Sequence, residues 1–290
     1  MELELKKECL DTYELGEPQT LTQEETAETI VPDYCPDIAR IISAEGVVCL
    51  HGGTEQDLSL IHISEQDGVT GTVRVTVLYT PENESGVRAL EFAMPFSAQG
   101  EGLAGCAHVV VETEIELLES RMLNPRKIFT RCKLVTHLAG CRKVCLTISS
   151  DAETDPALLV EKRCCGQTVS LLRQVAEKDL TFSETMSLSL GREGAAELLH
   201  CRANGIVTET KAIGNKLIFK GVFLVSALYR TIGGQLASAS AELPFSQIME
   251  TDSTEENTQV SMRLRITGTD IQIDGSDDEG RQLSVTVYYH

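Results

Sequence analysis

Apolar and polar side chains alternate along several stretches of the chain. In TVRVTVLY, which begins at Thr72, a valine stands at every second position. The same period of two recurs in HVVVETEIELLE (108–119) and in VSMRLRIT (260–267). Such alternation is typical of strands with one buried face. Residues 216–229 are more continuously apolar, which favours a strand buried on both faces.

Turn-forming clusters separate these runs, as in PENESG (81–86) and DGSDDEG (274–280). Short strands with regular turn signals are typical of antiparallel sandwiches. The pattern therefore predicts a mainly all-β fold with two tandem antiparallel β-sandwich-like domains and short helical caps.

The stretch VPDYCPDIARII (31–42) is the candidate for such a cap. Pro36 suits a first helical position, where its missing N–H is not needed. Ile38, Ile41 and Ile42 then share one helical face, and Gly46 would end the helix. We expect a stiff elbow that leads into a helix of about two turns, since the residues before each proline are restricted to extended geometry.

An internal repeat supports the tandem arrangement. GTVRVTVLYT and GVFLVSALYR begin 150 residues apart, and AMPFS and ELPFS repeat at an offset of 149. A weaker match relates LELKKEC to LVEKRCC and places Cys164 at the position of Cys9. The repeated residues are Gly71, Leu78, Tyr79, Pro95 and Phe96 in the first unit and Gly221, Leu228, Tyr229, Pro244 and Phe245 in the second.

We expect a first domain at 1–148, a polar, acidic linker at 149–156 and a second domain at 157–290. The repeated Tyr and Pro-Phe positions could line a binding groove. Packing is the favoured interpretation, because a Tyr at a strand end buries its ring and a Pro in a sheet belongs at an edge.

The net charge and composition of the chain disfavour several classes of binding partner. Lys and Arg number 25 and Asp and Glu number 44, so the net charge is −19. Nucleic acid would be repelled. Aromatics make up 4% of the chain and Trp is absent, which disfavours an aromatic platform for sugars. No apolar run of about 18 residues predicts a membrane span, and the N terminus lacks a signal-peptide pattern. We therefore expect a cytoplasmic protein.

Ten cysteines suggest either buried thiols or later cross-linking in an oxidising layer. The vicinal pair Cys164-Cys165 fits a strand with one thiol inward and one outward. His137, Cys141 and Cys145 are weak candidates for a metal site. On a strand, Cys141 and Cys145 would lie about 13 Å apart, too far for one metal. In a helix or tight loop the three could converge. No metal is expected.

Asp33 and Asp37 offer too few oxygen ligands for calcium. We expect Asp33 in a turn and Asp37 at the start of the helical cap. No residues orient a base toward a thiol, and no Gly-rich phosphate loop is present. The sequence therefore predicts no cofactor and no enzyme activity.

Four of these stretches, in order, carry a resemblance: VPDYCPDIARII, GTVRVTVLYT, AMPFS and MLNPRKI (122–128). Together they resemble the SPOCS domain family, found in spore envelope morphogenesis proteins of clostridia. The motif residues beyond the repeat are Pro32, Asp33, Pro36, Asp37, Ile38, Asn124, Pro125 and Arg126. The resemblance covers a fuller first copy and a degenerate second copy, with DGSDDEGRQ where the first has NPRK.

The resemblance implies a structural or adaptor protein of the spore envelope, made in the mother cell and either kept there or deposited on the forespore surface. Its partners would be envelope proteins or further copies of itself. The best-known members carry a LysM module, which these 290 residues lack, so no glycan-binding role of that kind is expected. The alternatives are a self-assembling filament or shell subunit, and a metal- or glycan-binding module.

Overall fold

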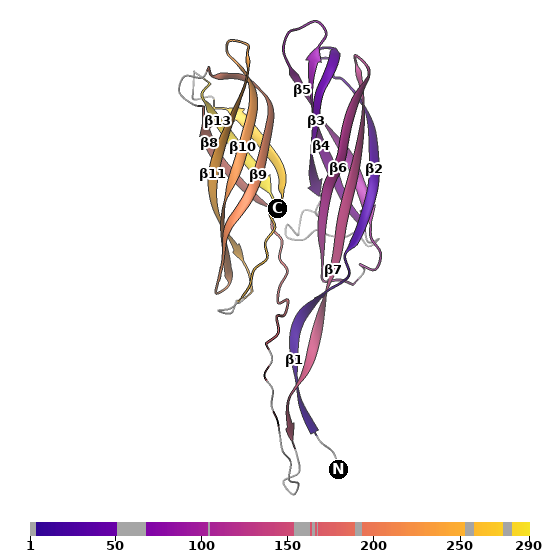
Figure 1. The fold of residues 1–290 in the computed structure, drawn as a ribbon, viewed down its shortest axis with the longest axis vertical. Helices are drawn as coiled ribbons and strands as arrows, with labels where there is room; N and C mark the ends of the chain where they lie inside the picture. The colour runs from indigo at the N-terminus through magenta and orange to yellow at the C-terminus, as the bar shows by residue number, and fades with distance from the viewer. Residues whose placement is uncertain are drawn as a thin grey trace.

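The computed structural model is built from antiparallel strands (Figure 1). It describes residues 4–50, 68–103, 105–153, 163, 166, 168–188, 193–252, 258–274 and 280–290. The described part forms thirteen strands and contains no helix, so none of its elements is a helix able to cross a membrane. The all-β prediction is confirmed.

The first lobe contains strands β1 to β7 in two sheets. One sheet has the order β3-β4-β5, and the other is organised around β7, which pairs with β1, β2 and β6. A core of side chains from both sheets lies between them. The bounds are β1 Glu4–Leu15, β2 Gln19–Ile30, β3 Ile38–Leu50, β4 Gly68–Pro81, β5 Arg88–Gln99, β6 His108–Asn124 and β7 Lys127–Glu153.

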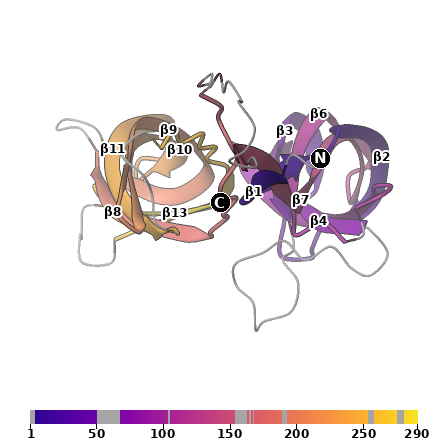
Figure 2. The ribbon, with the colours of Figure 1, turned by 90° about the horizontal axis from the view of Figure 1, so that it is seen from below.

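The second lobe contains strands β8 to β13, with sheet orders β9-β10-β11 and β8-β13-β12. Seen from below, each lobe shows two layers of strands facing one another (Figure 2). A second core fills this lobe. The bounds are β8 Leu180–Ser187, β9 Ala195–Ile213, β10 Lys216–Thr231, β11 Leu236–Glu250, β12 Ile266–Ile273 and β13 Gln282–Tyr289.

Period-two alternation located the central strands correctly, with two corrections. In β4 and β10 every second side chain is buried. The expectation that β10 would be buried on both faces was therefore wrong, because its other face is open or only partly covered. The strand expected at 260–267 begins only at Ile266, and residues 260–265 join no ladder.

Strand β7 extends beyond the first lobe. Its final part, from Cys141 to Glu153, pairs with β1 as a two-stranded ribbon that runs below the lobe toward the N terminus (Figure 1). Residues 149–153 thus belong to a strand, where a linker was expected. Residues 154–156 lie outside the described residues, and the domain boundaries stay a prediction.

The helical cap was a wrong prediction. Residues from Ile38 onward form β3, whose backbone pairs with β4. Bulges between Ile38 and Arg40 and between Ile41 and Ser43 each insert an extra residue. An inserted residue shifts the alternation of buried and exposed positions by one. Ile38, Ile41 and Ile42 therefore have the spacing of a helical face although they lie in a strand.

The two lobes share these irregularities. Their strands correspond in order, β2–β7 to β8–β13, and all pairs are antiparallel. The bulges of β3 recur in β9, where Ala195 pairs with Thr231 as Ile38 pairs with Pro81. One of the two bulges of β6, between Ile115 and Leu117, recurs in β12 between Ile266 and Gly268. Matched bulges are a backbone property that composition alone would not produce.

The sequence repeat records one packing arrangement in both lobes. Gly71 lies directly opposite Phe96 across β4 and β5, and Gly221 lies opposite Phe245 across β10 and β11. A Cβ atom on Gly71 would lie 2.5 Å from the Phe96 ring, and one on Gly221 would lie 2.6 Å from the Phe245 ring. Each glycine therefore makes room for the ring that covers it.

The other repeated residues take matching places. Tyr79 and Tyr229 are fully buried in their cores. Pro95 and Pro244 lie in β5 and β11, which are edge strands, so their missing N–H groups break no ladder. Neither proline ends its strand, since β5 continues to Gln99. Leu78 and Leu228 are also counterparts. Each pairs with a residue next to a bulge in the neighbouring strand, and each directly precedes its tyrosine.

We predict that Gly71→Ala lowers the free energy of unfolding by about 1–3 kcal/mol, because the methyl group forces the Phe96 ring out of place. Urea unfolding followed by circular dichroism measures the effect. Adding Phe96→Leu should recover part of the loss. Gly166→Ala is the control, since a Cβ there meets open space. Equal stability of Gly71→Ala and the parent protein would contradict the packing role.

Candidate functional site

Two of the family-like motifs of the first lobe, VPDYCPDIARII and MLNPRKI, meet at the elbow, residues 31–37, which carries the chain from β2 in one sheet to β3 in the other. The turn between β6 and β7 lies against it. Val31 donates its backbone N–H to the Arg126 carbonyl at 2.9 Å, and Ile38 donates to the Pro125 carbonyl at 2.9 Å. The elbow is therefore joined by backbone bonds to NPRK, a stretch some 90 residues away in sequence.

The Arg126 guanidinium holds the elbow closed. One of its nitrogens donates to the Cys35 carbonyl at 2.8 Å and to Asp37 Oδ1 at 3.0 Å. The other donates to the Val31 carbonyl at 2.9 Å and to Asp33 Oδ1 at 3.0 Å. A planar guanidinium suits such a set of acceptors because its donors diverge at fixed angles.

These contacts favour a structural role for Asp33 and Asp37 over a role as calcium ligands. Both carboxylates accept hydrogen bonds from one arginine, whose single positive charge offsets one of their two negative charges and makes the pair less suited to a cation. Asp33 lies in a turn, as predicted. The prediction that Asp37 starts a helix was wrong, since no helix follows it. Sequence reasoning did not foresee Arg126 as their partner, because the motifs that meet here are distant in the chain.

Tyr79, in β4, also holds the elbow in place. Its hydroxyl donates to the Pro36 carbonyl at 3.3 Å, and the ring is fully buried in the core. Burial raises the pKa of Tyr79 to about 12. Glu82, just after β4, donates its backbone N–H to the Asp37 carbonyl at 2.9 Å. The elbow is thus tied to both sheets of the sandwich.

The second lobe repeats the backbone of this site with different side chains. Leu188 donates to the Arg281 carbonyl at 2.8 Å, and Ala195 donates to the Gly280 carbonyl at 2.8 Å. Ile232 donates to the Gly194 carbonyl at 3.0 Å, as Glu82 donates to Asp37 in the first lobe. Arg281 therefore takes the place of Arg126. Gly194 stands where the first lobe has Asp37.

The weak metal candidates do not converge. His137, Cys141 and Cys145 lie along the single extended strand β7. The His137 Nδ1 atom is 3.0 Å from the Thr20 hydroxyl, and Cys141 is buried. Cys145 forms a disulfide with Cys9. Within the described part of the chain no group of three His, Cys, Asp or Glu side chains is placed to hold a metal.

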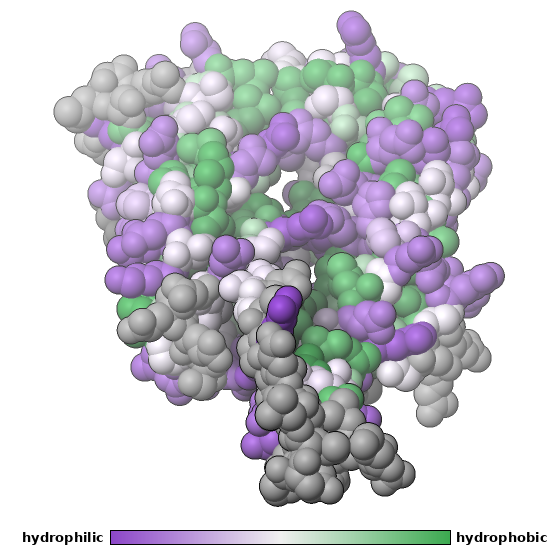
Figure 3. Space-filling view, turned by 60° about the horizontal axis from the view of Figure 1, so that its bottom comes forward, coloured by the Kyte–Doolittle hydropathy of each residue, from purple (hydrophilic) through white to green (hydrophobic). Residues whose placement is uncertain are grey.

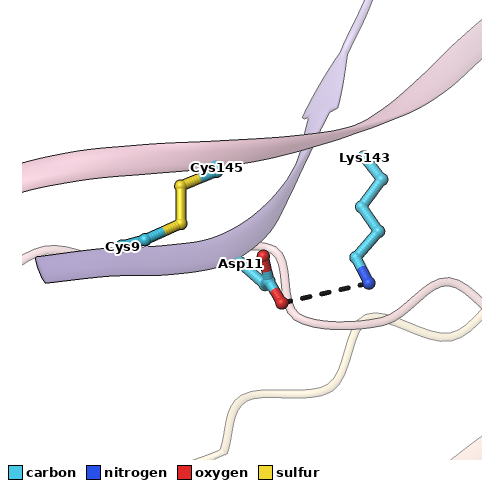
Figure 4. Close-up of a disulfide and its surroundings, with 4 residues drawn as sticks. All are labelled: Cys9, Asp11, Lys143 and Cys145. Atoms are coloured by element: carbon cyan, nitrogen blue, oxygen red, sulfur yellow. Dashed lines mark ion pairs between the residues drawn. A yellow bond between two sulfur atoms is a disulfide. The ribbon is translucent and has the colours of Figure 1, made fainter.

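The disulfide joins β1 to the end of β7 within the ribbon (Figure 4). The Cα atoms of Cys9 and Cys145 are 5.7 Å apart, although 136 residues separate them in sequence. Lys143 Nζ lies 3.9 Å from Asp11 Oδ2 beside it. Sequence reasoning missed this link, because cysteine spacing alone does not reveal which strands pair. Cys164 and Cys165 lie outside the described residues.

Four of the six remaining described thiols are poor nucleophiles. Burial raises the pKa of Cys132 to about 11 and that of Cys201 to about 12. Burial also raises the pKa of Cys49 and of Cys141. At neutral pH these four sulfurs are protonated, whereas the thiolate is the reactive form.

Polar contacts join the two lobes. The Glu197 carboxylate of β9 forms a salt bridge with Arg88 of the first lobe at 3.1 Å and another with Arg230 of its own lobe at 3.0 Å. Arg230 also donates to the Val87 carbonyl at 2.8 Å. The Cys49 thiol lies 2.7 Å from the Thr267 carbonyl. These contacts between the lobes are ion pairs or hydrogen bonds.

A large cleft lies between the lobes, visible as a hollow with apolar side chains inside it (Figure 3). Its volume is about 2530 Å³. Small-molecule pockets usually measure about 300–1,000 Å³. The cleft is therefore larger than a typical small-molecule pocket.

Comparison with known proteins gives one match. Residues 195–274 match the family model described as SipL, SPOCS domain. The match suggests a sporulation-related protein. It falls on strands β9 to β12 of the second lobe, although the motifs that carry the resemblance in sequence are more complete in the first. No curated protein and no solved structure matches the chain.

We predict that Arg126→Gln lowers the free energy of unfolding by about 1–3 kcal/mol, because the Val31 and Cys35 carbonyls lose their donor. Arg126→Lys should recover little, since one ammonium cannot reach four acceptors. Urea unfolding measures both. The control is Arg131→Gln, which removes an exposed pair with Glu24 and should change the free energy by about 0.5 kcal/mol or less. Equal effects of Arg126→Gln and Arg131→Gln would refute the role of Arg126 in the elbow.

We predict that reduction loosens the ribbon, because an isolated two-stranded ribbon is marginal without a cross-link. Reductant should expose two further thiols to labelling and increase proteolysis within residues 4–15. A Cys9→Ser, Cys145→Ser double variant should be cleaved there even without reductant and should not respond to it. Labelling of all ten cysteines in unreduced, unfolded protein would show that the bond does not form.

Proposed function

We propose that this chain is a non-enzymatic structural or adaptor protein of the bacterial spore envelope that acts through protein–protein contacts. The observation that carries the proposal is the match of residues 195–274 to the SPOCS domain model. We further propose that both lobes are copies of one SPOCS-like unit. The shared strand order, bulges and glycine–phenylalanine pairs support this extension.

The chemistry of the described residues supports a role in binding over one in catalysis. The conspicuous carboxylates of the elbow, Asp33 and Asp37, are held by Arg126. Four thiols have a raised pKa. These groups contribute to folding, and each has a structural partner or a buried place.

A self-assembling filament or shell subunit is the second candidate, and the ribbon favours it. The ribbon exposes large apolar side chains, with Leu5 45%, Leu146 42% and Ile148 38% exposed. Open strand edges of this kind can pair with other chains. The net charge of −19 opposes self-association at low salt, and we therefore prefer the adaptor role.

We propose that the protein is made in the mother-cell cytoplasm and deposited on the forespore surface. A fluorescent fusion imaged through sporulation in the organism of origin tests this directly. The expected result is a ring around the forespore that forms after engulfment begins. The fluorescent protein alone is the control and should stay diffuse. Diffuse signal from an intact fusion, or expression in vegetative cells only, would overturn the proposal.

A further inference from the structure

The β9-β10-β11 sheet of the second lobe has an apolar outer face. These strands form one layer of the lobe, opposite the layer that contains β8 and β13 (Figure 2). Along β10 the side chains that point away from the core alternate with buried ones, and directly paired residues of neighbouring strands share a face. The outer face therefore includes six large apolar residues, which together form the outer patch: Ile206, Ile213, Ile218, Val222, Leu224 and Ile248.

The outer patch is open to solvent. Ile206, Ile213 and Ile248 are each 51% exposed, and Leu224 is 37% exposed. The solvent side of an antiparallel sheet is usually polar. Contiguous exposed apolar side chains instead indicate a surface that contacts another molecule.

The first lobe shows that the fold does not require an apolar face here. At the offset of 150 residues, Val222 and Leu224 correspond to Thr72 and Arg74 of β4. Both strands lie between equivalent neighbours, β4 between β3 and β5 and β10 between β9 and β11. The apolar character of the outer patch is therefore a property of the second lobe and serves something other than its folding.

The charges around the outer patch are balanced, although the chain as a whole carries −19. Two acidic chains repel each other at long range, so a neutral apolar face is a place where two copies can meet with little repulsion. Three lysines and three glutamates stand among the residues of the patch: Lys211, Lys216, Lys220, Glu209, Glu242 and Glu250.

The positions of these charges favour one arrangement of two copies. Lys211 and Arg202 lie on β9, whereas Glu250 and Glu242 lie on β11. If two sheets pack face to face with parallel strands and the two-fold axis along β10, β9 of each copy lies over β11 of the other. Lys211 then faces Glu250, and Arg202 faces Glu242. Antiparallel strands would place β9 over β9 and β11 over β11, so that like charges face each other.

The lysines of the central strand are compatible with this arrangement. Lys220 Nζ lies 3.3 Å from Glu209 Oε2 of β9. The β9 strands of the two copies lie on opposite sides of the axis, so the two Lys220 ammonium groups turn away from each other. The aliphatic parts of these side chains add to the apolar surface. Lys216 stands at the margin of the face, opposite Glu250.

The face is large enough for a weak dimer. The stretch of β10 from Lys216 to Ser226 is about 34 Å long, and three strands are about 14 Å wide. Such a face buries about 500 Å² on each copy and about 1,000 Å² in total, which is the lower limit for specific interfaces. We therefore expect a dissociation constant of about 1–100 µM.

We propose that the outer patch joins two copies of this chain in a two-fold symmetric dimer, with β9 of one copy over β11 of the other. Aligned packing of two sheets is a common way to bury two apolar sheet faces. Because both copies use the same patch, the contact closes after two copies and does not build a filament. The inference goes beyond the envelope role and does not depend on it.

Sedimentation equilibrium of the full chain measures the dimer directly. At about 0.15 M salt the Debye length is about 8 Å, so the repulsion between distant acidic groups is screened. We expect a monomer–dimer equilibrium over protein concentrations of about 1–300 µM.

Charge exchange tests the arrangement. Lys211→Glu and Glu250→Lys each place like charges opposite one another twice in the dimer, and each should weaken it at least about tenfold. In an equimolar mixture of the two variants, the heterodimer again joins opposite charges at both places. We expect the mixture to recover a dissociation constant within about threefold of the parent value. Lys133→Glu, which changes the net charge equally on β7, is the control and should have less than about a twofold effect.

A second variant tests the apolar contact without disturbing the fold. Val222→Thr combined with Leu224→Arg copies Thr72 and Arg74 of the first lobe, where these side chains occur on the same kind of face. We expect an unchanged circular dichroism spectrum, a melting temperature within about 2 °C of the parent value, and a dimer weakened at least about a hundredfold.

Three results would overturn the inference. A parent chain that stays monomeric up to about 300 µM has no such contact. A dimer that the charge variants do not weaken, or that mixing them does not restore, does not place β9 over β11. Species that grow beyond the dimer with concentration contradict a closed contact. The localisation experiment is unaffected by any of these results, so the inference can fail while the envelope role stands.

Discussion

The backbone pairing of β7 is the constraint on which the first lobe depends. Each strand presents N–H and C=O groups that must find partners, and β7 supplies them to β2, β6 and β1 in turn. Its 27 residues therefore set both the depth of the sandwich and the length of the ribbon. Where β7 continues, the end of the core is closed. Its counterpart in the second lobe, β13, pairs with β8 on one side and β12 on the other.

The elbow solves a different problem, which is how the chain crosses between sheets without leaving carbonyl groups unpaired. Arg126 satisfies two carbonyls and two carboxylates with a single planar group. The surface exposure of Asp33 makes its own ion pair a weak contributor. The hydrogen bonds to the backbone carbonyls contribute more to stability. An unpaired, partly buried acceptor costs more free energy than an exposed ion pair gains.

Much of the fold could be predicted from the sequence. Period-two alternation identified β4 and β6, a continuously apolar run identified β10, and the offset of about 150 residues related the equivalent strands β4 and β10. The elements that failed were those in which a local pattern had two explanations. Ile38, Ile41 and Ile42 fit a helical face, and only the pairing of β3 with β4 shows that bulges produced that spacing.

The candidate site was less predictable, for a related reason. The motif residues were recognised individually, but their meeting depends on contacts across about 90 residues of sequence. Nothing local in NPRK indicates that Arg126 faces Asp33 and Asp37. The Cys9–Cys145 disulfide could not be predicted either, because it depends on the register in which β1 pairs with β7. The second lobe has the same backbone bonds with Gly194 in place of Asp37, although an arginine, Arg281, again stands in the place of Arg126.

Conserved backbone geometry and variable side chains together explain where the two lobes can differ in function. The bulges and the glycine–phenylalanine pairs are fixed by packing, because any residue larger than glycine at 71 or 221 meets a ring. The matched region, residues 195–274, lies within the strands that carry this geometry. The elbow lies outside these pairs, so its side chains can differ between the lobes without a change in the core. Gly194 stands where the first lobe has Asp37, and the backbone bonds of the elbow are present in both lobes.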